Sequence, residues 1–186
     1  EVFSNAVSLQ WIWGDEIKVY VVIFAESVNS KKLIIELEKR LLIKEEISIQ
    51  ISFGLGNLPP FALKDEPKRK KSIYQSEVLG LLGPEWGANT SSIIKLLQEA
   101  ISQRPTNTCF IASQQLGGQT QKINRGSSSF IHRDAIWKPW INASWNAGDL
   151  KQREESLFWL ENIWSKLEEP CPWVHLAQMH QHLPWH

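Results

Sequence analysis

Two apolar segments near the start of the chain, separated by a turn signal, most constrain its fold. Residues 6–13 and 17–25 are rich in β-branched and aromatic side chains, and Gly14-Asp15 lies between them. This pattern predicts a β-hairpin, because a short glycine-containing turn lets two such strands fold back on each other. A hairpin is an antiparallel unit, so we expect an antiparallel sheet.

Three later segments have the 3.6-residue apolar period of helices. Each begins near a capping residue: Asn29 or Ser30, then Thr90 or Ser91, then Asp149. Pro105 and Pro170 follow the second and third segments and mark where those helices stop. We predict helices over residues 29–42, 91–103 and 149–169, the last with Leu157, Leu160, Ile163, Trp164 and Leu167 on its buried face.

Further extended segments and one irregular segment complete the pattern. Because Pro139 lacks an N–H donor, we expect the strand that contains it to lie at a sheet edge or to be bulged there. Residues 54–72 hold two glycines, three prolines and a basic run, which favours a surface loop. The predicted extended segments are residues 46–53, 108–116, 129–132, 136–145 and 172–181.

The element order and the composition together favour one α+β domain over residues 1–186. Strand pairs interleaved with helices predict an antiparallel β-sheet with helices packed on one face. A chain of 186 residues with 42% hydrophobic side chains is large enough to bury a core.

Charge and cysteine content exclude several function classes. Lys+Arg and Asp+Glu are 20 each, so the basic excess of a nucleic-acid-binding protein is missing. No apolar run approaches the ~20 residues that span a membrane. Cys109 and Cys171 are too isolated for a disulfide framework or zinc site, which favours a cytoplasmic protein. The chain begins at Glu1 and its only methionine is Met179, so we expect a piece of a longer protein.

Residues 132–134, His-Arg-Asp, are the first candidate for chemistry. On a regular strand His132 and Asp134 would share a face and could form a hydrogen-bonded pair, while Arg133 would face the other way. No serine or cysteine completes a catalytic triad with them. The alternative interpretation is that His132 is structural and Arg133 holds a carboxylate or a ligand phosphate.

The tryptophan-rich strand that follows is the second candidate. Alternation places Lys138, Trp140 and Asn142 on one face. A cation, an indole and an amide together are typical of a pocket wall, so we predict that these residues bind a small-molecule substrate.

The histidine-rich end of the chain is the third candidate. It holds His175, His180, His182 and His186, and His180 and His182 would share a face of a strand. There is no HExxH motif and no cysteine pair, so we do not predict a metal site.

The sequence "LGGQTQKINRGSSSFIHRDAIWKPWINASW", followed by "LFWLENIWSKL", resembles the C-terminal part of the berberine-bridge-enzyme-like FAD-linked oxidases. Members of that family carry a Gly-Gly pair, a Phe-x-His-Arg element, a strand ending in tryptophan, and a helix with its own tryptophan. Gly117-Gly118, Phe130, His132-Arg133, Trp145 and Trp159 or Trp164 follow this order.

The resemblance implies the substrate-binding part of an FAD-dependent oxidoreductase that passes a hydride from a small organic substrate to flavin. In that family a separate N-terminal domain holds FAD, often through a histidine and a cysteine. We find no such domain in residues 1–186, so the chain alone is expected to be inactive and to work with an FAD-binding domain or chain. His132 and Arg133 are then the predicted cofactor contacts.

The chain departs from the family at the expected catalytic base. Trp140 occupies that position, and an indole N–H only donates. The family's Tyr-x-Asn-Tyr motif should fall near residues 177–182, where this chain has "AQMHQH". His180 or His182 is the predicted substitute base, because imidazole titrates near neutral pH. The alternative is a non-catalytic remnant or protein-interaction module of the same fold, and homo-oligomer formation stays open.

Overall fold

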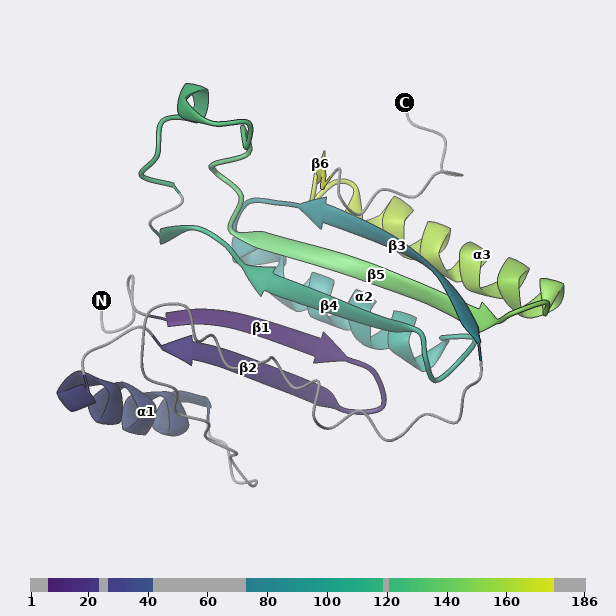
Figure 1. Cartoon of the computed structure of the whole chain (residues 1–186), viewed down its shortest axis with the longest axis horizontal. Coiled ribbons are helices and arrows are strands. Elements are labelled where there is room, and N and C mark those ends of the chain that lie inside the picture. Colours follow the sequence, from purple (N-terminus) through teal and green to yellow (C-terminus); the bar gives the residue numbers. More distant parts are fainter. Residues whose placement is uncertain (1–6, 24–26, 42–72, 119–120, 176–186) are drawn as a thin grey trace. The chain divides into compact units, whose positions relative to one another are not determined.

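The computed structural model describes residues 7–23, 27–41, 73–118 and 121–175 (Figure 1). The chain divides into two compact units, one of Glu1–Val7 with Val22–Lys71 and one of Ser8–Val21 with Ser72–His186. The predicted strand at 46–53 and the predicted loop at 54–72 lie outside the described residues.

The described part of the first unit is mainly helix α1, Ser27–Leu41. It begins two residues before the predicted cap, and its Leu33, Ile34 and Leu37 are half-buried while Lys31 and Lys32 are exposed. The predicted amphipathic helix is therefore confirmed. Among the described residues, no helix has both the length and the apolar character needed to cross a membrane.

The second unit is built on an antiparallel sheet in the order β2-β1-β4-β5-β3-β6. The predicted hairpin forms its first two strands, and the Gly14 N–H donates to the Glu16 carbonyl across the turn (3.1 Å). The strands are β1 Val7–Trp13, β2 Ile17–Ile23, β3 Tyr74–Leu82, β4 Phe110–Gln115, β5 Trp137–Asn146 and β6 Trp173–Val174.

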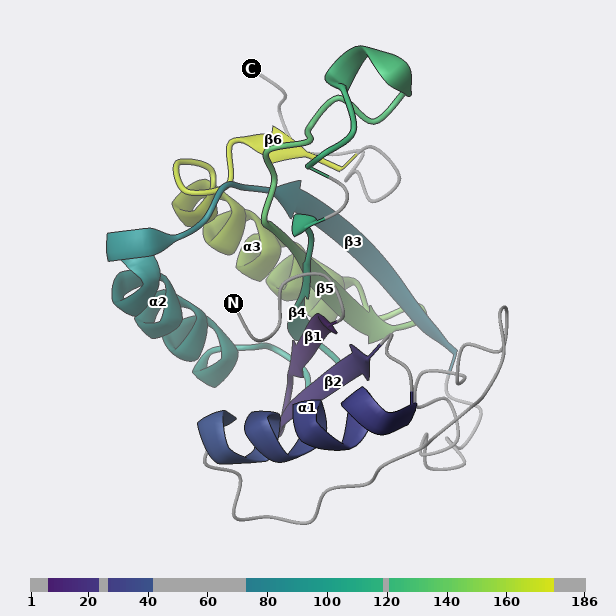
Figure 2. The same ribbon diagram turned by 90° about the vertical axis from the view of Figure 1, so that its left-hand side faces the viewer.

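Helices α2 (Thr90–Ser102) and α3 (Leu150–Leu167) cover the same face of this sheet, as Figure 2 shows. Side chains from both helices and from β3, β4 and β5 form one apolar core between the layers. The predicted α+β class, an antiparallel sheet with helices on one face, is confirmed. The fully buried core side chains include Leu79, Leu81, Leu97, Ile111, Ile141, Leu160 and Leu167.

Helix α3 confirms its predicted cap and most of its predicted buried face. The Asp149 carboxylate accepts the Gln152 N–H at 2.9 Å, as an N-cap residue should. Leu160, Ile163 and Leu167 are buried as predicted. Leu157 and Trp164 are only half-buried, and Ser156 and Trp159 take the remaining core positions. The Trp159 indole N–H donates to the Ala100 carbonyl (2.8 Å), which ties α3 to α2.

The prediction that Pro139 lies at a sheet edge or in a bulge is wrong, because β5 lies between β4 and β3 and its register with both strands is unchanged across Pro139. The β3–β5 ladder runs to the Gly80–Trp140 pair, and Gly83 then bridges Trp137. Trp137 exchanges backbone hydrogen bonds with Gly83. In an antiparallel pair every second residue faces the same partner strand, so the backbone nitrogen of Pro139, which lacks a hydrogen, also faces β3. The sheet tolerates this proline through a local gap in the ladder and not through an edge position.

The predicted strand at 129–132 is also absent. Residues 128–136 form a loop with a turn at Arg133-Asp134, in which the Ala135 N–H donates to the His132 carbonyl (3.2 Å). The last predicted strand is present only as β6, Trp173–Val174, and residues 176–181 lie outside the described residues.

Candidate functional site

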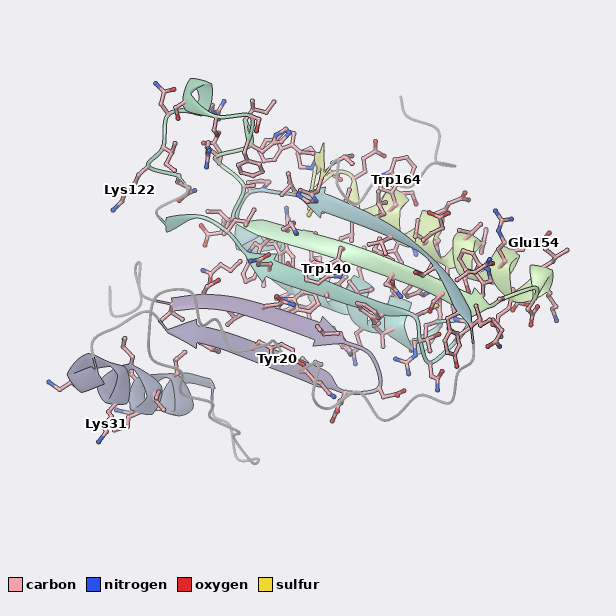
Figure 3. The ribbon with its side chains drawn as sticks, in the orientation of Figure 1. Tyr20, Lys31, Lys122, Trp140, Glu154 and Trp164 are labelled. Atoms are coloured by element: carbon pink, nitrogen blue, oxygen red, sulfur yellow. The ribbon has the colours of Figure 1, made fainter. Side chains whose placement is uncertain are left out.

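The three predicted substrate-binding side chains on β5 share the face opposite α2 and α3. Ile141 and Ala143, which alternate with them, are fully buried in the helix-side core. Lys138, Trp140 and Asn142 therefore point the other way and are half-buried. Figure 3 shows Trp140 in the middle of the sheet, on the side away from α3.

Neighbouring strands add two rows of side chains to this face. Gln114 lies opposite Lys138, and Gln10 lies opposite Gln114, so three long polar side chains form a row across β5, β4 and β1. The adjacent row is mostly apolar, with Trp140 between two small residues. We call this surface the Lys138 face and define it by Gln10, Ile12, Gly80, Ala112, Gln114, Lys138, Trp140 and Asn142.

The cross-strand neighbours of Trp140 are both small, and both are buried. Gly80 lies opposite it on β3 and Ala112 lies opposite it on β4. Cross-strand neighbours are about 5 Å apart, so bulky residues at these positions would press against the indole. The arrangement favours a flat surface on which a planar or ring-shaped ligand group could lie.

Lys138 is a half-buried cation on this surface. Its Nζ lies 5.5 Å from the centroid of the Trp140 ring, which is a cation–π contact. Among the residues that the structure describes, it forms no ion pair. Burial lowers the pKa of Lys138 below its usual value, because desolvation penalises the charged form.

Asn142 is fixed by the segment that precedes β4. Its Nδ2 donates to the Thr108 carbonyl at 3.3 Å. Ser144, two residues further along β5, donates its hydroxyl to Thr108 Oγ1 at 2.8 Å. The bond to Thr108 holds the Asn142 amide in one orientation and uses one of its two N–H donors, so the second N–H and the carbonyl oxygen of the amide can contact a ligand.

His132 and Arg133, the predicted cofactor contacts, lie in the loop before β5. The His132 ring stacks on Trp173 of β6, with 5.3 Å between the centroids. The Arg133 guanidinium lies 5.1 Å from the centre of the Phe130 ring, and it donates to the Ser128 hydroxyl. These contacts give both residues a structural role, and a contact with a cofactor stays a prediction.

Asp134 does not pair with His132. Its carboxylate forms an ion pair with Arg125, on the far side of the same loop. The prediction that His132 and Asp134 share a strand face is wrong, because the segment turns at Arg133-Asp134.

The predicted catalytic residues, His180 and His182, lie outside the described residues, as does His186. His175 is described, and its backbone N–H donates to the Gly80 carbonyl at 2.8 Å, next to the Trp140 row. The described ranges hold no group of three or more potential metal ligands.

Neither cysteine is accessible to a ligand. Cys109 is fully buried, with its Sγ close to the Ser144 carbonyl (3.5 Å) and to Ser156 Oγ (3.9 Å). Burial raises the pKa of Cys171 to about 11, because desolvation penalises the thiolate. Both thiols belong to the helix-side core, so neither fits a covalent flavin attachment.

Gln10 and Gln114 are the polar members of this surface that the sequence did not reveal, and Ile12, Gly80 and Ala112 were not predicted either. Alternation along "FIASQQ" does place Gln114 with Phe110 and Ala112. However, only the register of β4 against β5 and β1 shows that Gln114 meets Lys138 and Gln10. Pairing between distant strands has no local sequence signal.

Comparisons with known proteins give matches in structure only. No family model matches the chain, and no curated protein matches it. Berberine bridge enzyme from Eschscholzia californica superposes with a TM-score of 0.61 at 23% identity, over 91% of this chain and 34% of that one. The chain has the fold of part of berberine bridge enzyme.

Two related plant structures superpose more closely at lower identity. Wild-type BBE-like 1 from Physcomitrella patens gives a TM-score of 0.71 at 12% identity, over 98% of this chain and 41% of that one. BBE-like #28 from Arabidopsis thaliana gives 0.70 at 12% identity, over 99% and 41%. The chain thus spans about two fifths of the length of these proteins. The predicted resemblance to this family is confirmed at the level of the fold.

Proposed function

We propose that this chain is the substrate-binding part of an FAD-dependent oxidoreductase. The observation that carries the proposal is the Lys138 face, which presents an indole, an amine and amides on the side of the sheet opposite α2 and α3, in a chain with the fold of part of berberine bridge enzyme. Flavin would supply the hydride acceptor, and this chain would bind and orient a small organic substrate beside it.

The residues fit a role in covering a flavin and do not fit a role in holding it. Trp140, with Gly80 and Ala112 on either side, offers a flat surface for a ring. The backbone groups of the strands around it are bonded within the sheet, so they cannot cradle a phosphate. The buried cysteines cannot attach a flavin covalently. The cofactor would therefore be held by a separate domain or chain.

The side chains of this face then have distinct roles. Trp140 supplies the apolar surface, while Lys138 and Asn142 supply polar contacts that orient the substrate. His180 and His182 remain the proposed proton acceptors, because Trp140 cannot accept a proton.

The decisive experiment is on the complete gene product. The transcript that encodes this chain should be sequenced upstream of Glu1, and the encoded protein should be purified. We expect a yellow protein with a flavin spectrum, whose absorbance bleaches without oxygen when a substrate is added. A complete product that has no flavin-binding segment and co-purifies with no flavoprotein would contradict the proposal.

A binding module without catalysis is the second candidate. Trp140 at the position where the resemblance implies a base is the observation in its favour. This candidate predicts a flavin that stays oxidised with every ligand that binds the Lys138 face. Replacing Trp140 with glutamate distinguishes the two candidates. Turnover by the Trp140→Glu variant, together with no turnover by the original protein, would show that the original protein binds ligands but has lost its catalytic base.

A further inference from the structure

We propose that Lys138, Gln114 and Gln10 form a binding site for a carboxylate group of the substrate, while Trp140 and Ile12 hold its apolar body. This inference rests on the proposed function for the statement that the ligand is a substrate. It goes further by naming the chemical class: an apolar or aromatic ring that carries a carboxylate.

The first support is the position of the donors. Lys138 lies opposite Gln114 on β4, and Gln114 lies opposite Gln10 on β1. Directly paired residues on one face are about 5 Å apart at Cβ, so an ammonium and two amides can converge above the sheet. Together they offer N–H donors in a row, which suits the two oxygens of a carboxylate.

The second support is the charge on this face. Lys138 is half-buried and forms no ion pair within the part of the chain that the structure describes. None of the residues that β1, β3, β4 and β5 place on this face is acidic; Glu77 of β3 pairs with Ala143 and so belongs to the helix side. A bound anion would supply the missing counter-charge to a partly desolvated cation.

The third support is the neighbouring apolar row. Trp140, Ala112 and Ile12 lie side by side on β5, β4 and β1, one row from Lys138, Gln114 and Gln10. A ligand with its carboxylate on the polar row would therefore place its ring on the apolar row. A phosphate fits less well, because these strands offer no free backbone N–H groups to surround its oxygens.

The test uses the full 186-residue chain and two small probes, phenylacetate and its neutral counterpart phenylacetamide. Binding is followed by NMR on ¹⁵N-labelled protein through the indole N–H signals of the ten tryptophans. The signal of Trp140 is the one that disappears in a Trp140→Phe variant. We expect this signal to shift with phenylacetate, at an affinity about tenfold above that for phenylacetamide, because charge-assisted hydrogen bonds are the stronger ones.

Matched variants identify the residues responsible. Lys138→Met should remove the preference for phenylacetate, and Lys138→Arg should keep most of it because the charge is retained. Gln114→Leu should weaken phenylacetate binding by about threefold to tenfold, as the loss of one such hydrogen bond does. Lys95→Met on α2 and Gln115→Leu, whose side chain is exposed, are the controls and should bind like the unmodified chain.

Three results would overturn the proposal: no shift of the Trp140 signal with phenylacetate, equal affinity for both probes, or an undiminished preference in a folded Lys138→Met variant. None of these results depends on flavin. If the complete gene product reduces flavin with neutral substrates while the chain ignores phenylacetate, the carboxylate site fails and the proposed function stands.

Discussion

The two faces of the sheet in the second unit use the same strands for opposite purposes. On the helix side, Leu79, Ile111 and Ile141 lie next to one another and are completely buried. On the other side, Gln114, Lys138 and Trp140 are only half-buried, whereas the small residues Gly80 and Ala112 beside Trp140 are buried. β5 is therefore a core strand on its helix side and carries the proposed substrate contacts on the other, so the effect of a substitution depends on which face it reaches.

Removing core volume from the helix side should have the largest effect. Ile141→Ala should lower the free energy of unfolding by about 2–5 kcal/mol, because Ile141 is fully buried between β3 and β4. Urea denaturation followed by circular dichroism measures this. Asn142→Ala, the adjacent residue on the other face, should cost about 1 kcal/mol for its lost hydrogen bond. Equal losses of unfolding free energy in Ile141→Ala and Asn142→Ala would show that the two faces do not differ in their contribution to stability.

Adding volume on the helix side should be the next most costly change. A Cβ at Gly83 would lie 2.7 Å from the Pro170 carbonyl oxygen and 2.9 Å from Cys171 Sγ. Gly83→Ala should therefore destabilise the protein by about 1–3 kcal/mol. The comparison variant is Gly126→Ala, where the nearest atom is 3.8 Å away. A melting temperature for Gly83→Ala as high as that of Gly126→Ala would show that the region around Pro170 is not tightly packed.

The buried thiol of Cys171 should make stability fall at alkaline pH. Its pKa is about 11 in the folded protein and 9.0 ordinarily, so only the unfolded chain loses this proton between those values. The contribution of the neutral Cys171 thiol to the free energy of unfolding is fully present below pH 9 and is lost as pH rises through 11. By pH 10 this loss is about 1.4 kcal/mol. The difference in unfolding free energy between the original chain and Cys171→Ala, measured from pH 8 to pH 10, should shrink. A constant difference would contradict the prediction.

Removing the charge of Lys138, on the face opposite the helices, should have the smallest effect on stability. Lys138→Met should change the unfolding free energy by no more than about 0.5 kcal/mol, because it removes a partly desolvated cation with no ion-pair partner among the described residues. Urea titration of both proteins checks this. A loss of several kcal/mol would make Lys138 a structural residue and weaken its assignment to ligand binding.

Local sequence signals predicted the elements that local physics determines. Asp149 capped its helix, the apolar stripe of α3 reached the core at Leu160 and Ile163, and the hairpin formed around Gly14. Alternation along β5 also separated Lys138, Trp140 and Asn142 from Ile141. Each of these depends on side chains within a few residues of one another.

The failures and omissions depended on distant partners. Pro139 suggested an edge strand, yet β5 pairs with both β3 and β4. The Pro139 nitrogen, which has no hydrogen, faces β3, so only the pairing with β3 loses a hydrogen bond. His132 suggested a strand, but contacts with Trp173 and Phe130 hold it in a loop. Gln10 joined the candidate site through a register that no nearby residue encodes.

The strand order also has a kinetic consequence. β1 lies near the start of the chain and pairs with β2 on one side, yet its partner on the other side is β4, which follows β3 and α2 in sequence. The polar row of Gln10, Gln114 and Lys138 is therefore complete only after β1 has paired with β4, about 100 residues further along the chain. Such non-local pairing slows folding, because a long loop must close before the contact is gained. Until β1 pairs with it, β4 has one unpaired edge, on the side opposite β5, and a folding intermediate of this chain would be most prone to aggregate there.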